Sequence, residues 1–375
     1  MNDILEQAFA GRRVLVTGHT GFKGGWLSVW LEMLGARVTG VAIDDGHERG
    51  VYVLTGIGSR LEADLRADVR DAQAMRCIVA DCRPEVVFHL AAQPLVRLSY
   101  EQPAETFMTN VMGTVNVLEA IRAVGTVRAA VMVTSDKCYE NNDGQRPFTE
   151  DDPMGGYDPY SASKGATELA IAAWRRSFRE PVASVRAGNV IGGGDWAADR
   201  IVPDCIRAIE ADRPVTLRNP DAVRPWQHVL EPLGGYLLLA AKMLNEPTAY
   251  REGWNFGPAM DGVTTVGQLA EMVVECYGSG TIMASPTPLL KEGAMHEARL
   301  LSLDITKAQR RLGWQPRLDI NKAVAMTVDW YRRANAVTAL DLCRHQISQY
   351  AFLPPPEGWG RRKVISSNEL QETVS

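Results

Sequence analysis

The sequence predicts an α/β fold: a doubly wound parallel sheet with helices on both faces, and a smaller mixed α/β lobe beside it. Two observations support this class. Apolar runs of strand length alternate with helix-like stretches through the first half of the chain. The strand runs are also apolar throughout, and not only at every second residue. Continuous apolar strands are typical of a sheet that is covered on both faces.

Six strands are expected in the first half, each a short β-branched or apolar run that ends at a turn or at a helical stretch. The expected strands are Arg12–Thr17, Ala36–Ile43, Arg60–Leu65, Glu85–Ala92, Val127–Thr134 and Val182–Gly188. Apolar residues recur at helical spacing between them. The expected helices are Gly21–Gly35, Asp71–Cys82, Ala104–Val124 and Pro159–Arg179.

The alternation loosens after Gly188, which predicts a division of the chain into parts. Residues 1–187 are expected to form the first domain, with elements near residues 226–257 returning to it. Residues 188–225 and 258–338 are expected to form the smaller lobe, laid over the carboxyl ends of the strands. Residues 339–375 read as an irregular C-terminal tail.

Composition excludes several classes of protein. The 375 residues carry a net charge of -5, which counts against nucleic-acid binding. The most apolar stretch is too short to span a bilayer, and the first residues lack the pattern of a signal peptide. The six cysteines and six histidines show no ligand-like spacing. We therefore expect a cytoplasmic protein with reduced thiols, no metal site and no membrane partner.

A glycine-rich turn lies between the first expected strand and the first expected helix. Its glycines have the spacing G-x-x-G-x-x-G. Glycine permits a tight turn and lets the backbone approach a pyrophosphate, while the helix N-terminus supplies free N–H groups. The turn is therefore expected to bind a dinucleotide, in a domain of the Rossmann type. The expected contacts are Gly18, Thr20, Gly21, Phe22, Lys23 and Gly24.

Further cofactor contacts are expected at the carboxyl ends of the next strands. Asp44 and Asp45 follow the second strand, where an acid holds the adenosine ribose of NAD, whereas nearby Arg49 would suit the 2′-phosphate of NADP. These residues leave the choice between the two cofactors open. The remaining expected contacts are Asp68 and Val69 after the third strand, and Leu90, Ala91, Ala92 and Gln93 at the end of the fourth.

Tyr160 and Lys164 are four residues apart in an expected helix, so their side chains share a face. An ammonium near a phenol favours the phenolate, and we expect it to lower the pKa of Tyr160 toward the working pH. Such a tyrosine can exchange a proton with a substrate hydroxyl while a hydride moves to or from nicotinamide. The alternative is a pair on a helix surface, which the glycine motif upstream disfavours.

Asp136 and Lys137 follow the strand expected over Val127–Thr134. Burying a charge costs several kcal/mol unless it is paired or used. The alternative, an ion pair between these neighbours, is disfavoured because adjacent side chains of an extended segment point to opposite sides. We therefore expect the two charges to have a use at the end of this strand other than pairing with each other.

Together the motifs resemble one family. The blocks "TGHTGFKG", "HLAAQ", "TNVMGT", "VTSDK", "YSASK" and "VRAGNV" are similar to those of the extended short-chain dehydrogenase/reductases that act on nucleotide sugars. The longer blocks "AAQPLVRLSY" and "RPWQHVLEPL" are similar to those of its dehydratases, and the resemblance extends from about Gly18 to Arg317. One departure concerns the ribose: many relatives carry the acid nearer the position of Ala42, which puts Asp44 in doubt.

The resemblance implies NAD as cofactor and CDP-glucose as substrate. It implies that Tyr160 removes the C4 hydroxyl proton while C4 is oxidised, that water is then eliminated across C5 and C6, and that the hydride returns to C6. Asp136 is the implied acid at the C6 oxygen and Lys137 the implied C5 base, although which of the two takes the C5 proton stays open. Thr134 and Ser135 are expected to orient sugar hydroxyls, and Asn110 to support the site through hydrogen bonds.

The resemblance also implies a set of substrate contacts, most of them arginines, whose planar forks suit a diphosphate. Asn189 and Arg224 are expected at the pyrophosphate, Arg299 near the phosphates or ribose, Arg218 beside the base, and Arg200 in the wall of the cleft. Nothing physical in these residues selects cytosine over another base.

Two other functions stay in consideration. A sugar-nucleotide 4-epimerase of the same family would only oxidise and re-reduce C4, and would not need Asp136 with Lys137. A non-catalytic, NAD-responsive binding protein would be expected to have lost the Tyr160–Lys164 pair, which is intact. The resemblance further implies a homodimer through the helices expected over Ala104–Val124 and Pro159–Arg179, or a tetramer.

Overall fold

The computed structural model describes residues 1–141, 146–217, 219–258, 263–284 and 301–354. At its centre lies a seven-stranded sheet in the order β11-β6-β5-β4-β1-β2-β3, and every neighbouring pair is parallel. The strands are β1 (Arg13–Thr17), β2 (Arg37–Ala42), β3 (Ala63–Arg66), β4 (Val86–His89), β5 (Ala129–Val133), β6 (Val182–Ala187) and β11 (Gly253–Phe256). The predicted fold class is confirmed, and β11 adds a strand from late in the chain beside β6.

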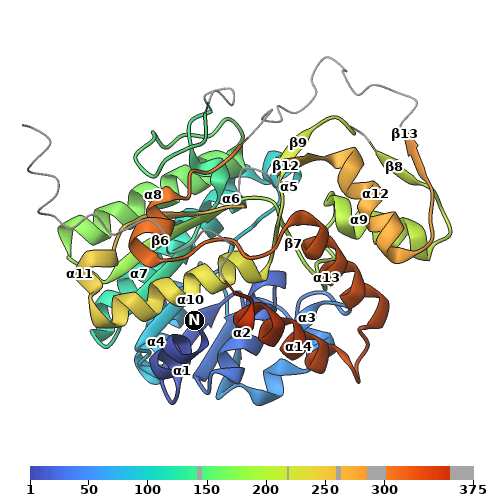
Figure 1. The fold of residues 1–375 in the computed structure, drawn as a ribbon. Helices are drawn as coiled ribbons and strands as arrows, with labels where there is room; N and C mark the ends of the chain where they lie inside the picture. The colour runs from blue at the N-terminus through green and yellow to red at the C-terminus, as the bar shows by residue number, and fades with distance from the viewer. Residues whose placement is uncertain (142–145, 218, 259–262, 285–300, 355–375) are drawn as a thin grey trace, which may run out of the picture.

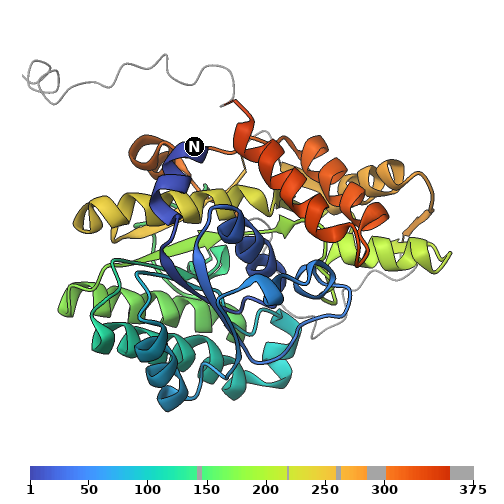
Figure 2. The ribbon, with the colours of Figure 1, turned by 90° about the horizontal axis from the view of Figure 1, so that it is seen from below.

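Helices cover both faces of the sheet, as Figure 2 shows edge-on. Successive residues of a strand point to opposite faces. On β1, Val14 and Val16 join one apolar core and Leu15 joins the other. The first core packs against α1 (Asn2–Phe9), α2 (Phe22–Met33) and α10 (Leu230–Asn245). The second packs against α4 (Ala72–Cys82), α7 (Gly113–Val124) and α8 (Pro159–Ser177).

The helix expected over Ala104–Val124 is interrupted by a turn of π-helix at Met108–Met112. It is built from α6 (Pro103–Phe107), this π turn and α7, and it follows α5 (Val96–Glu101). A π turn inserts one residue into the helical ladder and so redirects the side chains beside it, often at functional sites. Here it carries Asn110, which is 1% exposed.

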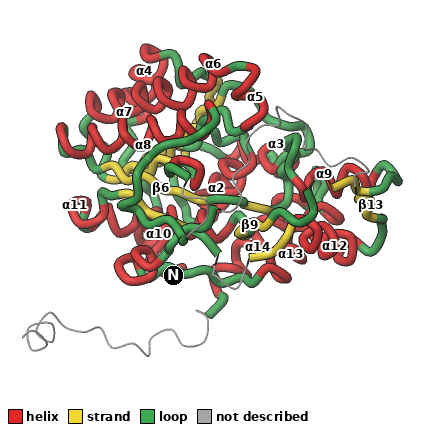
Figure 3. Tube along the Cα trace, turned by 90° about the horizontal axis from the view of Figure 1, so that it is seen from above, coloured by secondary structure: helices red, strands yellow, loops and turns green. Residues whose placement is uncertain are grey.

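A smaller lobe extends from one end of the sheet, on the right in Figures 1 and 3. Its strands form short pairs: β9 with β12 antiparallel and β8 with β13 parallel, while β7 pairs with β10 near the main sheet. The strands are β7 (Val190–Ile191), β8 (Val215–Leu217), β9 (Val223–Pro225), β10 (Gln227–His228), β12 (Val263–Thr265) and β13 (Ile282–Ala284). The accompanying helices are α9 (Ile201–Glu210), α12 (Val266–Tyr277) and α13 (Ile320–Arg333).

The irregular tail expected from residue 339 is wrong over its first part. Residues Ala339–Phe352 form helix α14, which packs against α2 and buries Leu342, Ile347 and Tyr350. Its apolar face supplies the burial that stabilises the helix, and Arg344 pairs with Glu32 of α2 at 2.8 Å. Residues 355–375 lie outside the described residues.

The other short elements are α3 (Val51–Thr55), α11 (Pro247–Tyr250), 3-10 turns at Ile57–Arg60 and Asp136–Cys138, and a π turn at Ala308–Leu312. Within the ranges that the structure describes, no helix has the length and apolar character needed to cross a membrane.

Candidate active site

The glycine-rich turn between β1 and α2 forms a cradle that side chains would fill. Gly18 has φ +74°, and a Cβ there would lie 2.7 Å from the backbone nitrogen of Ala91. A Cβ on Gly24 would lie 2.0 Å from the Gly18 carbonyl oxygen. Helix α2 follows the N-cap residue Gly21, with no side-chain cap and no acid in its first turn, which leaves its N–H groups and positive dipole end available to an anion. The turn therefore fits the phosphates of a dinucleotide.

The acids expected near the adenosine already have partners within the chain. Asp44 accepts a hydrogen bond from the Gly46 N–H at 2.9 Å, and Asp45 pairs with Arg66. Asp68 pairs with Arg70 at 2.6 Å. The carboxylates after β2 and β3 are thus held by local contacts.

Two other residues of this region are also occupied. Val69 is buried in the core below α7, and Arg49 pairs with Glu210 at 2.6 Å and stacks on Trp196. Because Arg49 is engaged in this way, its guanidinium is not poised for a 2′-phosphate.

Asn110 fastens the segment Leu90–Gln93, which follows β4. Its Oδ1 accepts the Gln93 N–H at 2.8 Å, and its Nδ2 donates to the Gln93 carbonyl at 3.1 Å and to Ser163 Oγ at 2.9 Å. The side chain of Gln93 is itself hydrogen-bonded to Thr106 and to the Leu95 carbonyl. Gln93 is therefore held in place through both its backbone and its side-chain amide.

Local sequence sets the start of helix α8, which carries Tyr160 and Lys164. Asp158 is the N-cap and accepts the Ser161 N–H at 2.9 Å, and Pro159 fits the first turn, where no N–H partner is needed. The helix lies close to the segment after β5, because a Cβ on Gly165 would meet the Gly155 carbonyl oxygen at 2.4 Å. Both Tyr160 and Lys164 are buried as a result.

Burial changes the acidity of both residues, and the expected direction for Tyr160 is wrong. Burial raises the pKa of the Tyr160 phenol to about 12, and the charge of Asp136 adds to the rise. A side-chain hydrogen bond from Ser135 and the charge of Arg200 oppose it. Burial lowers the pKa of Lys164 to about 8, and its Nζ donates to the Val133 carbonyl at 3.4 Å. Desolvation is thus the largest influence on the pKa of both side chains.

Asp136, Lys137 and Cys138 form a short 3-10 turn after the extended N-cap residue Ser135, and not the extended segment that was expected. The Ser135 Oγ accepts the Lys137 N–H at 3.2 Å and donates to Asp136 Oδ1 at 2.9 Å. Asp136 is 4% exposed, whereas Lys137 is half-buried. No ion pair joins these two residues, both of which the structure describes. The carboxylate therefore faces Ser135 and not its neighbouring ammonium.

Thr134, expected to orient a sugar hydroxyl, instead donates its hydroxyl hydrogen to Glu168 Oε1 at 2.5 Å. Glu168 also accepts from Ser184 and pairs with Arg186 at 2.8 Å, and all four side chains are buried. Burial alone would raise the pKa of Glu168, but the charge of Arg186 and the hydrogen bonds hold it below its usual value.

Sequence reasoning missed Glu168 and Arg186. The position of Glu168, one helical turn beyond Lys164 on the same face of α8, was the signal that could have found it.

Lys23 lies among charges that come from three separate segments. Burial lowers its pKa to about 8, and the charges of Arg200 and Lys164 lower it further, while Asp136 and Asp195 oppose the shift. Arg200 is held over this region by an ion pair with Asp195 at 2.6 Å. The pKa of Lys23, which is expected to meet the cofactor at the glycine turn, is therefore also influenced by the charge of Asp136.

The expected substrate residues divide between described and undescribed parts of the chain. Asn189 lies between β6 and β7, and its carbonyl accepts the Gln227 N–H at 3.1 Å. Arg224 lies on β9, beside Thr264 of β12. Arg218 and Arg299 lie outside the described residues.

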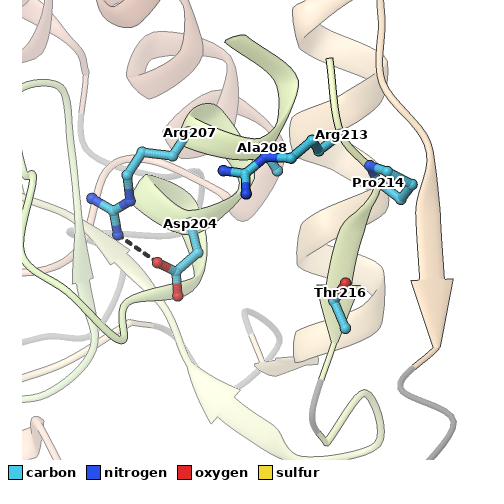
Figure 4. Close-up of a pocket in the computed structure, with 6 residues that line it drawn as sticks. All are labelled: Asp204, Arg207, Ala208, Arg213, Pro214 and Thr216. Carbon is cyan, nitrogen blue, oxygen red and sulfur yellow. Dashed lines mark hydrogen bonds and ion pairs between the residues drawn. The ribbon is translucent and has the colours of Figure 1, made fainter. Parts of the chain in front are cut away.

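A hollow of about 420 Å³ lies between α9 and β8 in the small lobe. Figure 4 shows Arg207 paired with Asp204 on α9, and Thr216 on β8 across from them. Ala208, Arg213 and Pro214 complete the lining. None of the residues around Tyr160 lines this hollow, so it belongs to the small lobe and not to the centre around Tyr160.

Comparison with known proteins agrees with this geometry. The model of the family described as GDP-mannose 4,6 dehydratase matches residues 15–327. The chain is 46% identical to a CDP-glucose 4,6-dehydratase of Salmonella typhimurium, over 91% of this chain and 96% of that protein. It is 28% identical to a UDP-glucose 4-epimerase of Mycolicibacterium smegmatis, over 85% of this chain and 98% of that protein.

Two solved structures are also similar to the chain. A dTDP-glucose 4,6-dehydratase of Streptomyces venezuelae with NAD bound has a TM-score of 0.71 and 25% identity, and the match covers 85% of this chain and 97% of that one. A UDP-glucose 4-epimerase of Thermus thermophilus in complex with NAD has a TM-score of 0.74 and 25% identity, and the match covers 86% and 99% of the two chains.

Proposed function

The chain belongs to the GDP-mannose 4,6 dehydratase family of extended short-chain dehydrogenase/reductases, and from this premise we propose that it is an NAD-dependent CDP-glucose 4,6-dehydratase. Its product would be CDP-4-dehydro-6-deoxy-D-glucose. The observation that carries the proposal is the buried carboxylate of Asp136 beside Tyr160, because a 4-epimerase needs the tyrosine but no acid for elimination. The identity to a curated CDP-glucose 4,6-dehydratase over most of both chains supports the same choice of substrate.

Oxidation and elimination require separate proton transfers. Tyr160 takes the proton of the C4 hydroxyl, and the Lys164 ammonium stabilises the phenolate that accepts it. The C4 ketone acidifies the C5 hydrogen, which a base then removes. Asp136 protonates the C6 oxygen, which leaves as water. Lys137 is the proposed C5 base; the half-buried position of its side chain next to Asp136 supports this role.

When bound, NAD would supply the hydride chemistry that no side chain can, between C4 and C6 of the sugar. The glycine turn and the free N-terminus of α2 are the proposed pyrophosphate site, and the backbone of Leu90–Gln93 is the proposed edge of the nicotinamide site. The tight approach of Gly18 to Ala91 supports a close fit there. The adenine is proposed to lie near Asp68 and Val69.

The nucleotide is proposed to lie between the main sheet and the small lobe. Asn189, Arg200 and Arg224 would contact the diphosphate, since amides and guanidinium forks suit phosphate oxygens. Arg200 is already held by Asp195, which would fix the direction of its fork. Arg218 and Arg299 remain proposals from resemblance.

A homodimer, or a tetramer built from two such dimers, is proposed through α6, α7 and α8. Exposed apolar side chains on these helices and on the π turn support this surface: Phe107, Met108, Met112 and Leu169 are 38%, 48%, 42% and 63% exposed.

A cytoplasmic site of action is proposed because all six cysteines are free thiols.

One assay tests the function. The protein is incubated with NAD and CDP-glucose, and the product is analysed by mass and by the absorbance that 4-keto sugars develop in alkali. Loss of one water is the expected result. An isomer of unchanged mass would support the epimerase instead, and no turnover of CDP-glucose or other nucleotide sugars would leave only a binding protein.

A further inference from the structure

An exposed ion pair joins the two sides of the proposed substrate site. Arg97 Nη1 of α5 lies 3.1 Å from Oδ1 of Asp199, in the loop between β7 and α9, and the two side chains are 48% and 41% exposed. Helix α5 follows the segment Leu90–Gln93, which is proposed for the nicotinamide. Asp199 immediately precedes Arg200, which is proposed for the diphosphate. The pair therefore connects the cofactor side of the site to the substrate side.

The α5 end of this connection has a fixed base. Ser99, two residues beyond Arg97, is buried, and its Oγ accepts the Tyr160 N–H at 3.1 Å. This hydrogen bond ties α5 to the first turn of α8, the helix that carries Tyr160 and Lys164. The anchoring point that Arg97 offers is therefore fixed relative to the proposed reaction centre.

The loop end is held at Asp195 and Trp196 by contacts with other elements. The Asp195 carbonyl accepts the Tyr331 hydroxyl of α13 at 2.5 Å, and Trp196 Nε1 donates to a backbone carbonyl of the loop after β2 at 2.7 Å. Asp199 lies beyond them, where the loop is exposed, and has φ +61°. Aspartate tolerates this left-handed conformation better than most residues. Asp199 thus combines a backbone turn with a charged contact directly before Arg200, the N-cap of α9.

The guanidinium of Arg200 is held separately. It pairs with Asp195 at 2.6 Å, and its charge influences the pKa of Tyr160 and that of Lys23. Asp195 constrains the tip of the Arg200 side chain, whereas the ion pair at Asp199 constrains the backbone from which that side chain starts. A planar guanidinium fork binds two phosphate oxygens well only when its direction is fixed. Both constraints therefore bear on how Arg200 would meet a diphosphate.

We propose that Arg97 and Asp199 are positioning residues, whose ion pair holds the loop against α5 so that the Arg200 guanidinium meets the diphosphate of the nucleotide sugar. The inference deepens the proposed function and rests on it. Neither residue of the pair contacts the substrate. An exposed ion pair changes an equilibrium by up to about fivefold. The effect on diphosphate binding is therefore moderate, and elimination at the sugar does not depend on the pair.

Titration of the protein with CDP measures the diphosphate site without turnover. Arg97→Ala and Asp199→Asn should each raise the Kd for CDP about three- to fivefold, with a parallel rise in KM for CDP-glucose and little change in kcat. Asparagine also tolerates a positive φ, so Asp199→Asn removes the charge and keeps the backbone turn. Arg97→Lys should recover part of the affinity. At about 1 M salt, which screens exposed charges, the difference between Arg97→Ala and the wild type should disappear.

A double-variant cycle tests whether the pair acts through Arg200. In an Arg200→Ala background, Arg97→Ala should leave the Kd for CDP unchanged, because changes that act through one shared group are not additive. The matched control is Arg37→Ala. Arg37 forms a similarly exposed pair with Glu62 at the amino end of β2, the opposite edge of the sheet from the site. This control should bind CDP as the wild type does.

Three results would overturn the positioning role while leaving the proposed function intact. Weaker CDP binding in Arg97→Ala but not in Asp199→Asn would show that Arg97 contacts the ligand directly. An unchanged Kd in both variants would show that the pair has no part in binding. An equal loss with and without the Arg200 guanidinium would show that the pair acts elsewhere.

Failure of the wild-type protein to remove water from CDP-glucose is a separate result. It would overturn the proposed function, whereas the CDP titrations decide the role of the ion pair.

Discussion

Around Tyr160 the polar side chains are buried and hydrogen-bonded within the chain, whereas Arg224 is half-buried on a strand of three residues. The first region joins a glycine turn, two strand ends and a long helix, and its members contact one another. The second consists of paired short strands beside an open hollow. Proton transfer needs fixed distances and shifted pKa values, which burial supplies. Nucleotide binding needs charge and shape, which a less rigid lobe can provide.

The contrast predicts that changes near Tyr160 lower kcat, and that changes in the small lobe raise KM. The largest effect is expected from Tyr160→Phe, which should lower kcat by roughly 1,000-fold or more because the C4 proton loses its acceptor. Steady-state formation of the 4-keto product measures this, with KM for CDP-glucose little changed. A Tyr160→Phe enzyme with near-normal kcat would contradict the division between the two regions.

The next effect concerns stability. Glu168→Gln should lower the free energy of unfolding by about 3–5 kcal/mol, because it leaves the charge of Arg186 buried without its partner. Urea denaturation measures the change. The matched control is Asp329→Asn, which breaks an exposed pair with Arg333 and should cost at most about 1 kcal/mol. Similar losses in the two variants would mean that the buried pair of Glu168 and Arg186 contributes no more to stability than an exposed pair.

The proposed role of Lys137 as C5 base can be tested against Lys23, a second lysine whose pKa is influenced by Asp136. Lys137→Ala should keep cofactor binding but slow elimination by about 100-fold. Lys23→Met should mainly weaken NAD affinity, which is measured by titration of the protein with NAD. If Lys137→Ala turns over normally while Lys23→Met cannot eliminate water, the C5 base is Lys23 and not Lys137.

The pH dependence of kcat follows from Lys164. Because burial lowers its pKa to about 8, the ammonium is present below that pH and is lost above it. The kcat should therefore fall by about tenfold per pH unit well above pH 8. Lys164→Arg retains its charge and should move the fall to higher pH. Lys23 has a similar pKa, so a fall that persists unchanged in Lys164→Arg but disappears in Lys23→Met would reassign the dependence.

The smallest effect is expected in the small lobe. Arg224→Ala should raise KM for CDP-glucose by roughly tenfold, with kcat nearly unchanged, because it removes charge-assisted hydrogen bonds to the diphosphate. Arg224→Lys keeps the charge but not the fork and should recover only part of the affinity. Initial rates over a range of substrate concentrations test both variants. A large fall in kcat would contradict the division between the two regions.

The sequence by itself determined the order of strands and helices, the glycine turn and the start of α8. These features depend on residues close together in the chain: apolar runs, glycines before a helix, and Asp158 followed by Pro159. The family blocks pointed to the residues around Tyr160 for the same reason, since each block is a short continuous segment. Residue 339 onward was misjudged because the burial that stabilises α14 comes from α2, more than three hundred residues earlier.

Only the tertiary structure decided where the side chains of the site point and which groups are desolvated. Neighbours in sequence were separated in role: Thr134 turns to Glu168, and Ser135 turns to Asp136. The pKa of Tyr160 moved opposite to the expectation, because spacing on a helix reports the nearby ammonium but not the burial of the phenol. Desolvation and hydrogen-bond direction arise from all the segments that meet at a point, and these segments come together only when the chain is folded.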